Sequence, residues 1–360
     1  MNASSKYRAG QWVKVREAGD ILRTLDQDGC LEGLPFMPEM LQFCGREFQV
    51  FKRAHKTCDT VNKTGGRRLA NAVHLTELRC DGGAHGGCQA GCLLFWKDAW
   101  LEPVTARGGG GAPAAGLQGT NACDGSSMSL ERLTFCTQDR KVGTESEPVY
   151  RCQATQLPQA TQLLPWWDVR QYVEDYTSGN IGIGRLLRGA TYMGYYHLIN
   201  AGIGIGSCLR WVYDRFQKIT GGTPYPRRPG KIPPGERTPT AVLDLQPGEL
   251  VRVKSHEEIL KTLDHNCKNR GLLFDAEEVP YCGGTYRVRS RVERIINEQT
   301  GKMHPLKGSA VILEGVYCKA CYSSKRLFCP RAIYPYWREI WLERVGSPSP
   351  TVAGKTRSGG

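Results

Sequence analysis

One segment of this sequence occurs twice. Residues 10–45 read GQWVKVREAGDILRTLDQDGCLEGLPFMPEMLQFCG and residues 248–283 read GELVRVKSHEEILKTLDHNCKNRGLLFDAEEVPYCG, and the two align without a gap. The match continues to the closely similar endings WKDAWLEPV (96–104) and WREIWLERV (337–345). A match of this length predicts an internal duplication, in which each copy is one structural unit with the same apolar pattern.

Both copies carry the pattern of short antiparallel strands. Apolar residues alternate in runs such as WVKV, FQVF and VHLTEL, and turn-rich spacers separate the runs. The Gly-x-x-Val-x-Val start and the Trp-Leu-Glu-x-Val end resemble small SH3-like barrels, including the KOW-type variety, and this resemblance implies a fold without a function. We therefore expect a mainly β chain, with two SH3-like barrels related by internal duplication flanking a central α-helical segment.

The composition between the copies changes several times, which sets the expected domain boundaries. A Gly/Ala-rich run and a Pro-rich run indicate linkers. The uncharged run 189–209 is nominally long enough to span a bilayer, but arginines flank both of its ends. We therefore expect helices packed on the barrels, and membrane contact is not expected. The expected divisions are barrel 1 with a cysteine cluster (8–104), a linker (105–120), a cysteine-containing hairpin region (121–165), the helical segment (166–217), a Pro-rich linker (218–245), barrel 2 with a cysteine cluster (246–345) and a disordered tail (346–360).

The bulk composition is that of a soluble globular protein, with 40% hydrophobic and 23% charged residues. The formal net charge of +13 is compatible with nucleic acid, an anionic membrane surface or an acidic partner, and equally with a basic surface that only aids solubility. The first residues contain no apolar signal-peptide core, and the chain has 15 cysteines. We therefore expect a cytoplasmic location, where clustered cysteines are more often metal ligands or reactive thiols than disulfides.

The cysteines in front of the first repeated ending predict a thiolate metal site. The loop CDGGAHGGCQAGC (80–92) holds Cys80, Cys88 and Cys92, and its glycines allow the backbone to fold around an ion. Cys58 or His85 is the candidate fourth ligand. Zinc is the expected metal because it takes four nitrogen or sulfur ligands, and an iron–sulfur cluster is the alternative.

A second candidate site precedes the second ending. Cys318, Cys321 and Cys329 lie in CKACYSSKRLFC, and Cys282 or Cys267 is the candidate fourth ligand. The Cys-x2-Cys spacing is typical of half a zinc knuckle. A redox-active dithiol is a weaker alternative, because no helix N-terminus that would lower a thiol pKa is evident. Cys44 and Cys282 each lie in an aromatic-Cys-Gly motif at a strand end and are better interpreted as small core residues. Three further cysteines, Cys123, Cys136 and Cys152, could form a third site but are explained more simply as thiols of a structured hairpin.

Nothing in the sequence indicates a particular catalytic chemistry. The motifs GxSxG, GxxxxGK[ST] and HExxH are absent from it. The run GIGIG (202–206) follows a helical pattern rather than a strand, so we interpret it as close helix packing rather than a dinucleotide loop. Asp26 and Asp264 each follow Thr-Leu, which suggests a turn or cap role. The chain is thus more easily explained as a non-enzymatic protein.

Nucleic-acid binding is the first alternative function. The run RVRSRVER contains Arg287, Arg289, Arg291 and Arg294, and alternate residues of a strand share one face. Aromatic residues downstream could stack on bases, namely Tyr322, Tyr334, Tyr336 and Trp337.

The function that we expect is that of a metal-stabilised binding or accessory protein. Small barrels have limited cores, and a bound metal supplies folding stability that such cores lack. The partner is expected to be another protein, and an iron–sulfur or other metal-dependent redox component is the second alternative. The run YRCQATQLP followed by WWDVRQYVEDYTSGN resembles segments of uncharacterised bacterial proteins, and this resemblance implies no activity.

Overall fold

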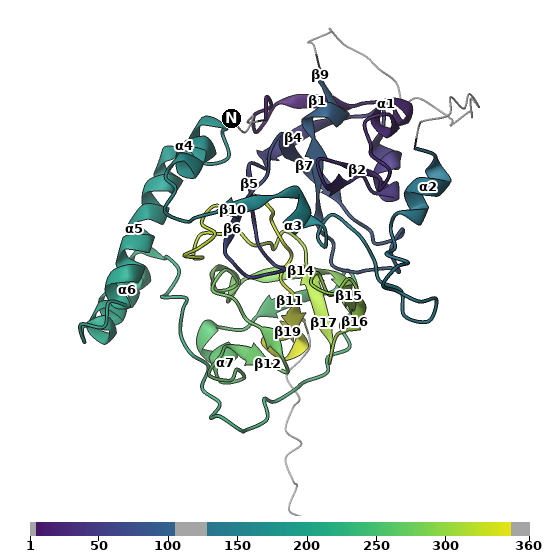
Figure 1. Cartoon of the computed structure of the whole chain (residues 1–360). Coiled ribbons are helices and arrows are strands. Elements are labelled where there is room, and N and C mark those ends of the chain that lie inside the picture. The colour runs from purple at the N-terminus through teal and green to yellow at the C-terminus, as the bar shows by residue number, and fades with distance from the viewer. Residues whose placement is uncertain (1–4, 105–127, 347–360) are drawn as a thin grey trace, which may run out of the picture. The chain divides into compact units, whose positions relative to one another are not determined.

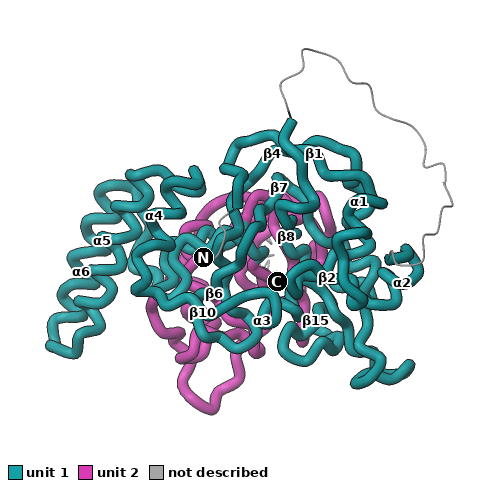
Figure 2. Tube along the Cα trace, turned by 45° about the horizontal axis from the view of Figure 1, so that its top comes forward, with its two compact units in different colours: residues 1–226, 293–306, 317–334 teal, residues 227–292, 307–316, 335–360 magenta. Residues whose placement is uncertain are grey.

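The computed structural model describes residues 5–104 and 128–346. The expected linker 105–120, Cys123 and nearly all of the expected tail lie outside the described residues. The chain divides into two compact units (Figure 2). Unit 1 comprises residues 1–226, 293–306 and 317–334, and unit 2 comprises residues 227–292, 307–316 and 335–360. Two segments of the second sequence copy therefore belong to unit 1.

A five-stranded antiparallel sheet forms the centre of unit 1, with strand order β8-β7-β4-β1-β9 (Figure 1). The strands are β1 (Trp12–Val15), β4 (Glu47–Arg53), β7 (Ala72–Arg79), β8 (Leu93–Lys97) and β9 (Leu101–Pro103). Three smaller sheets accompany it. They are β2 (Cys30–Leu31) with β3 (Leu34–Pro35), β10 (Gln162–Leu164) with β6 (Gly66–Arg68) and β5 (Lys56–Cys58), and β15 (Arg294–Ile296) with β16 (Met303–Pro305).

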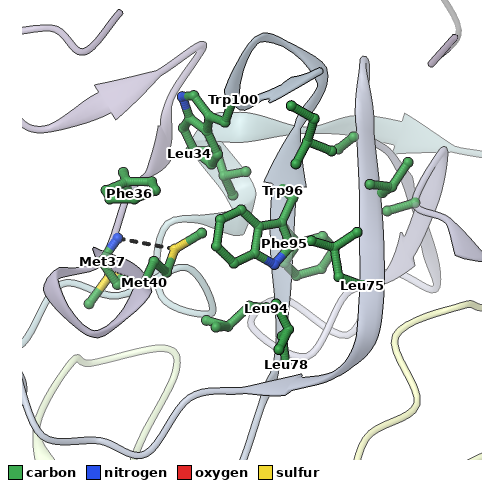
Figure 3. Packing of buried hydrophobic residues seen from close by; sticks show 14 of the residues in the cluster. Leu34, Phe36, Met37, Met40, Leu75, Leu78, Leu94, Phe95, Trp96 and Trp100 are labelled. Carbon is green, nitrogen blue, oxygen red and sulfur yellow. Dashed lines mark hydrogen bonds between the residues drawn. The ribbon is translucent and has the colours of Figure 1, made fainter. Parts of the chain in front are cut away.

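Two tryptophans at the end of the first sequence copy fill the core of unit 1. Trp96 and Trp100 are both 0% exposed, and Phe36 meets each of them edge to face, with centroid distances of 6.2 and 5.2 Å (Figure 3). Indole Nε1 of Trp100 donates a hydrogen bond to Thr24 Oγ1 at 3.1 Å. Trp100 thus has both its ring edge and its indole N–H satisfied in the interior, whereas Nε1 of Trp96 is buried without a hydrogen-bond partner.

Unit 2 has its own five-stranded antiparallel sheet, with order β18-β17-β14-β11-β19. Phe274 packs edge to face on Trp337 and Trp341 at 6.0 and 5.3 Å, and Trp341 Nε1 donates to Thr262 Oγ1 at 3.0 Å. The strands are β11 (Leu250–Val253), β14 (Thr285–Arg291), β17 (Ala310–Leu313), β18 (Trp337–Arg338) and β19 (Leu342–Arg344), with β12 (Lys268–Asn269) and β13 (Leu272–Leu273) in a separate hairpin.

The chain is therefore mainly β with antiparallel sheets and few helices, as the sequence predicts. The expected turn role of Asp26 and Asp264 is confirmed. Oδ1 of Asp26 accepts from the amides of Asp28 and Cys30, both at 2.9 Å. Oδ1 of Asp264 accepts from the amides of Asn266 and Lys268 at 2.8 and 2.9 Å.

Most helices of the described chain belong to unit 1. Residues 130–135, which the sequence suggested as part of a hairpin, form a helix because Ser129 caps its first turn by accepting from Arg132 N. Within the described part of that region, the two sides of the expected hairpin pair only at an antiparallel bridge between Gln138 and Tyr150, while Val149 forms a bridge with Lys302. The α-helices are α1 (Ala18–Leu22), α2 (Leu130–Phe135), α3 (Leu157–Ala160), α4 (Arg170–Thr177), α5 (Ile183–Ile199) and α6 (Gly206–Thr220) in unit 1 and α7 (His256–Leu260) in unit 2. The 3₁₀ helices are η1 (Pro38–Phe43), η2 (Asp98–Trp100), η3 (Val279–Tyr281) and η4 (Glu339–Trp341).

Helices α4, α5 and α6 lie together at one side of unit 1 (Figure 1). A buried ion pair attaches α4 to β5, because Lys56 Nζ contacts Asp175 Oδ2 at 2.6 Å and both side chains are almost fully buried. Helix α5 packs closely at Gly189, where a Cβ atom would lie 2.3 Å from Phe328 Cζ.

The sequence predicts that these helices pack on the barrels, and this prediction is wrong for α6. None of its residues is buried. The GIGIG run is mainly an exposed connection between α5 and α6, in which Gly202 and Gly204 adopt positive φ angles. Close helix packing is confirmed only at its last residue, Gly206, where a Cβ atom would lie 2.7 Å from the carbonyl oxygen of Ile199. No helix in the described residues has both the length and the apolar character needed to cross a membrane.

The repeated Trp–Thr hydrogen bond gives a matched pair of variants. Thr24→Val and Thr262→Val keep the shape of the side chain but remove the acceptor for a buried indole N–H, so each should lower the free energy of unfolding by about 1 kcal/mol. Chemical denaturation of both variants, with Thr76→Val as an exposed control in β7, measures the change. Equal stability of all three variants and the wild type would contradict this role.

Candidate metal centre

The loop between β7 and β8 is held closed at its base. The amide of Cys80 donates to the carbonyl of Cys92 at 2.8 Å, which places the two cysteines side by side. The amide of Gly87 donates to the carbonyl of Gly82 at 2.9 Å and tightens the loop. Gly82 has a φ of +76°, and a Cβ atom there would lie 2.1 Å from the Cys88 carbonyl oxygen. The glycines are therefore required for the close approach that the sequence suggested.

Within this loop, Cys80 and His85 meet a buried carboxylate. Cys80 Sγ donates to Glu39 Oε1 at 3.2 Å and lies 3.4 Å from His85 Nε2, while His85 Nδ1 lies 3.6 Å from the same carboxylate oxygen. One ligand atom from each of the three residues lies within 4.8 Å of the others. A single ion could therefore be bound by a sulfur, a nitrogen and an oxygen, a donor set that suits zinc.

Sequence reasoning missed Glu39, which lies on η1. A usable signal was present, because Asp26 and Glu39 are the acidic residues that residues 10–45 share with the aligned residues 248–283. An acidic residue inside an apolar run has to be paired when it becomes buried. Glu39 is 8% exposed.

Burial shifts the pKa of all three residues toward their uncharged forms. Burial raises the pKa of Glu39 and, together with Glu39, raises that of Cys80 far above its usual range. Burial also lowers the pKa of His85 to about 4, so its imidazole is neutral at pH 7 and able to ligate. Glu39 Oε2 and His85 Nδ1 are buried without a hydrogen-bond partner. A divalent cation would stabilise both the thiolate and the carboxylate and would use these unsatisfied atoms.

The same loop borders a cavity of about 30 Å³ in unit 1, enough room for an ion or a water molecule. Cys88 Sγ accepts a hydrogen bond from the amide of Ile296 at 3.3 Å. Of the residues proposed for the first site, four line this cavity and Cys58 does not. The ionisable lining residues are Cys80, His85, Cys88, Cys92, Cys152, Glu298 and Arg331.

Cys152 reaches the cavity because its neighbour is fixed to β8. The buried side chain of Gln153 accepts from Phe95 N at 2.8 Å and donates to Phe95 O at 2.9 Å and to Pro35 O at 3.0 Å. Burial raises the pKa of Cys152 to about 11 and that of Cys92 to about 12. The sequence left Cys152 without an assigned role, and only long-range pairing places it here.

The remaining predicted ligands lie elsewhere. Cys58 packs with Cys329, Ala320 and Cys318 in a separate small cluster of unit 1. Cys321 accepts from Arg185 Nη2 at 3.4 Å. Cys282 and Cys267 belong to unit 2, where both pack against its core, so the structure does not group either one with Cys318, Cys321 and Cys329.

The arginines proposed for nucleic-acid binding are divided between the units. Arg287, Arg289 and Arg291 are on β14 of unit 2, while Arg294 is on β15 of unit 1. Arg291 Nη1 pairs with Asp244 Oδ1 at 2.9 Å, which offsets its charge. Two of the proposed stacking residues, Trp337 and Tyr334, are buried and not accessible to a base.

Comparisons of the chain with protein-family models, with curated proteins and with solved structures found no match.

The duplication supplies a control for the role of Glu39. Glu39→Gln should weaken zinc binding at least about tenfold, because a neutral amide oxygen replaces a carboxylate beside Cys80 and His85. Glu277→Gln alters the aligned buried glutamate of unit 2 and should leave zinc affinity unchanged. Competition with a chromogenic chelator measures both affinities, and equal affinities for the two variants would remove Glu39 from the site.

Proposed function

We propose that this protein is a non-enzymatic binding protein whose fold is stabilised by a bound metal ion. The observation that carries the metal assignment is the convergence of Glu39, Cys80 and His85 within ligand distance in the loop between β7 and β8. A metal ion there would link η1 to the loop before β8. It would thus fix the segment that leads into the core residue Trp96.

Zinc is the metal that we propose. It accepts sulfur, nitrogen and oxygen ligands together and needs no redox partner. An iron–sulfur cluster is the second candidate, since Cys80, Cys88, Cys92 and Cys152 line one cavity and four thiolates suit a cluster.

We further propose that the two five-stranded sheets are SH3-like barrels that arose by duplication. Three features support this. The two sheets have equivalent strand orders, each core has the same arrangement of one phenylalanine on two tryptophans, and the Trp–Thr hydrogen bond recurs.

The exposed face of α5 and α6 is the surface that we propose for a protein partner. Trp211, Phe216 and Ile219 of α6 are 66%, 60% and 77% exposed, and Leu187 and Leu198 of α5 are exposed as well. Exposed large apolar side chains gathered on neighbouring helices favour an interaction site, and aromatic residues dominate binding energy at protein interfaces. This surface replaces the barrels as the proposed binding element.

Nucleic-acid binding by β14 remains an alternative proposal. Arg287 and Arg289 are exposed on this strand, and the chain carries a formal charge of +13. The ion pair of Arg291 and the burial of Trp337 weigh against a built interface.

Elemental analysis of anaerobically purified protein tests the metal assignment. We expect colourless protein that contains zinc, and a lower melting temperature after treatment with a chelator, because metal binding free energy is part of the folding free energy. Cys80→Ser should lower the zinc content, whereas Cys44→Ser, a half-buried core cysteine, should not. Brown protein with iron and inorganic sulfide would support the cluster instead, and metal-free protein with an unchanged melting temperature would contradict both.

Site-specific photo-crosslinking in cells tests the binding surface. A photoreactive residue at Trp211 should yield discrete crosslinked protein, while the same residue at Val242, which is also exposed but lies in unit 2, should not. Combining the probe with Phe216→Asp should abolish the product. Crosslinking to lipid alone, or an equal product from Val242, would contradict a protein partner on this face.

A further inference from the structure

Three cysteines of unit 1 that do not line the cavity pack together, and a fourth, Cys321, follows one of them, Cys318, by three positions in the sequence. Cys58, at the end of β5, and Cys329 are both buried and pack together with Ala320, and Cys318 packs against them. The side chains of Cys58 and Cys329 are thus adjacent in one cluster. The buried position of these thiols fits a closed structural site rather than an exposed reactive one.

The backbone around Cys318, Cys321 and Cys329 has the form of two facing turns. The amide of Cys318 donates to the carbonyl of Ile333, and the amide of Phe328 donates to the carbonyl of Ala320, both at 2.8 Å. These bonds bring the Cys-x2-Cys turn against the segment that contains Cys329. Ala320 and Phe328, which precede Cys321 and Cys329, have φ angles of +50° and +61°. Non-glycine residues rarely adopt this conformation, and tight turns at functional sites are where such strain persists.

Basic residues surround the four thiols. Arg185 Nη2 donates to Cys321 Sγ at 3.4 Å, and Arg331 Nη1 donates to Cys58 Sγ at 4.0 Å. Neutral thiols offer little to these cations, whereas a zinc ion with four thiolates carries a net charge of −2 and would be stabilised by them.

We propose that Cys58, Cys318, Cys321 and Cys329 form a second metal site of unit 1, a four-thiolate zinc centre separate from the cavity. One zinc ion replaces four thiol protons, and no oxidant or reductant is involved. Zinc–sulfur bonds of about 2.3 Å require the sulfurs to close on one point, and three of the four cysteines already belong to one small packed cluster. The ion joins the end of β5 to the segment 317–334.

This site differs from the pattern that the sequence suggests. The fourth ligand comes from the first sequence copy rather than from Cys282 or Cys267 in the second. The proposal does not rest on the cavity site, since the two sites share no ligand residue.

Metal stoichiometry of zinc-loaded protein tests the proposal. We expect wild-type protein to hold one more equivalent of zinc than either Cys58→Ser or Cys321→Ser. Cys80→Ser should lose an equivalent from the cavity site, and adding Cys321→Ser to it should remove a second equivalent. Cys44→Ser and Cys282→Ser should lose none. Substitution with Co²⁺ provides a second readout, because loss of a thiolate ligand lowers the sulfur-to-cobalt charge-transfer absorption.

The outcomes separate the two sites. Full zinc content in a folded Cys58→Ser variant would overturn the proposal, as would a Cys58–Cys329 disulfide in metal-replete protein analysed by non-reducing peptide mapping. Because Cys58 is buried, the Cys58→Ser variant could fail to fold. In that case the zinc content of Cys321→Ser tests the proposal, because the Cys321 thiol is not fully buried. Loss of zinc from Cys321→Ser but not from Cys80→Ser would support this centre and remove the cavity site.

Discussion

The rest of the structure depends on the burial of two tryptophans at the end of each sequence copy. In unit 1, Trp96 on β8 and Trp100 just after it are completely enclosed, and β8 pairs with β7 along its length. Because Trp96 fixes β8, it also fixes Cys92 immediately before this strand, and the backbone bond from Cys80 to Cys92 then closes the loop. The candidate metal centre is thus a consequence of core packing rather than of a separate folding element.

Buried polar atoms without partners are what distinguish this loop from an ordinary turn. A carboxylate, an imidazole and a thiol lie together at Glu39, Cys80 and His85, and the protein itself leaves two of their atoms unsatisfied. At another buried site of unit 1, by contrast, the charge of Asp175 is paired within the chain by Lys56. An uncompensated buried group costs stability, so a cation at the loop accounts for an arrangement that would otherwise be unfavourable.

Helices α4 and α5 are fixed to the rest of unit 1 by buried contacts, whereas α6 exposes large apolar side chains. Helix α4 is fixed to β5 by the buried Lys56, and α5 is fixed through Gly189 against Phe328. Helix α6 packs only through half-buried residues such as Leu209 and Tyr213, and it presents Trp211 and Phe216 to solvent. A surface that adds nothing to the core but keeps large aromatic side chains exposed is better explained by a partner than by folding.

The sequence by itself determined the repeated pattern, the antiparallel strands, the turn roles of Asp26 and Asp264, and the local grouping of cysteines with His85, because these depend on spacing along the chain. Tertiary structure alone decided three things. It brought Glu39 and Cys152 to the loop, it placed Cys58 beside Cys329 rather than in the cavity, and it left α6 exposed. Each of these depends on contacts between residues far apart in the sequence, which apolar periodicity and cysteine spacing cannot report. The sequence therefore shows which side chains can bind a metal or a partner, and long-range packing determines which of them lie together.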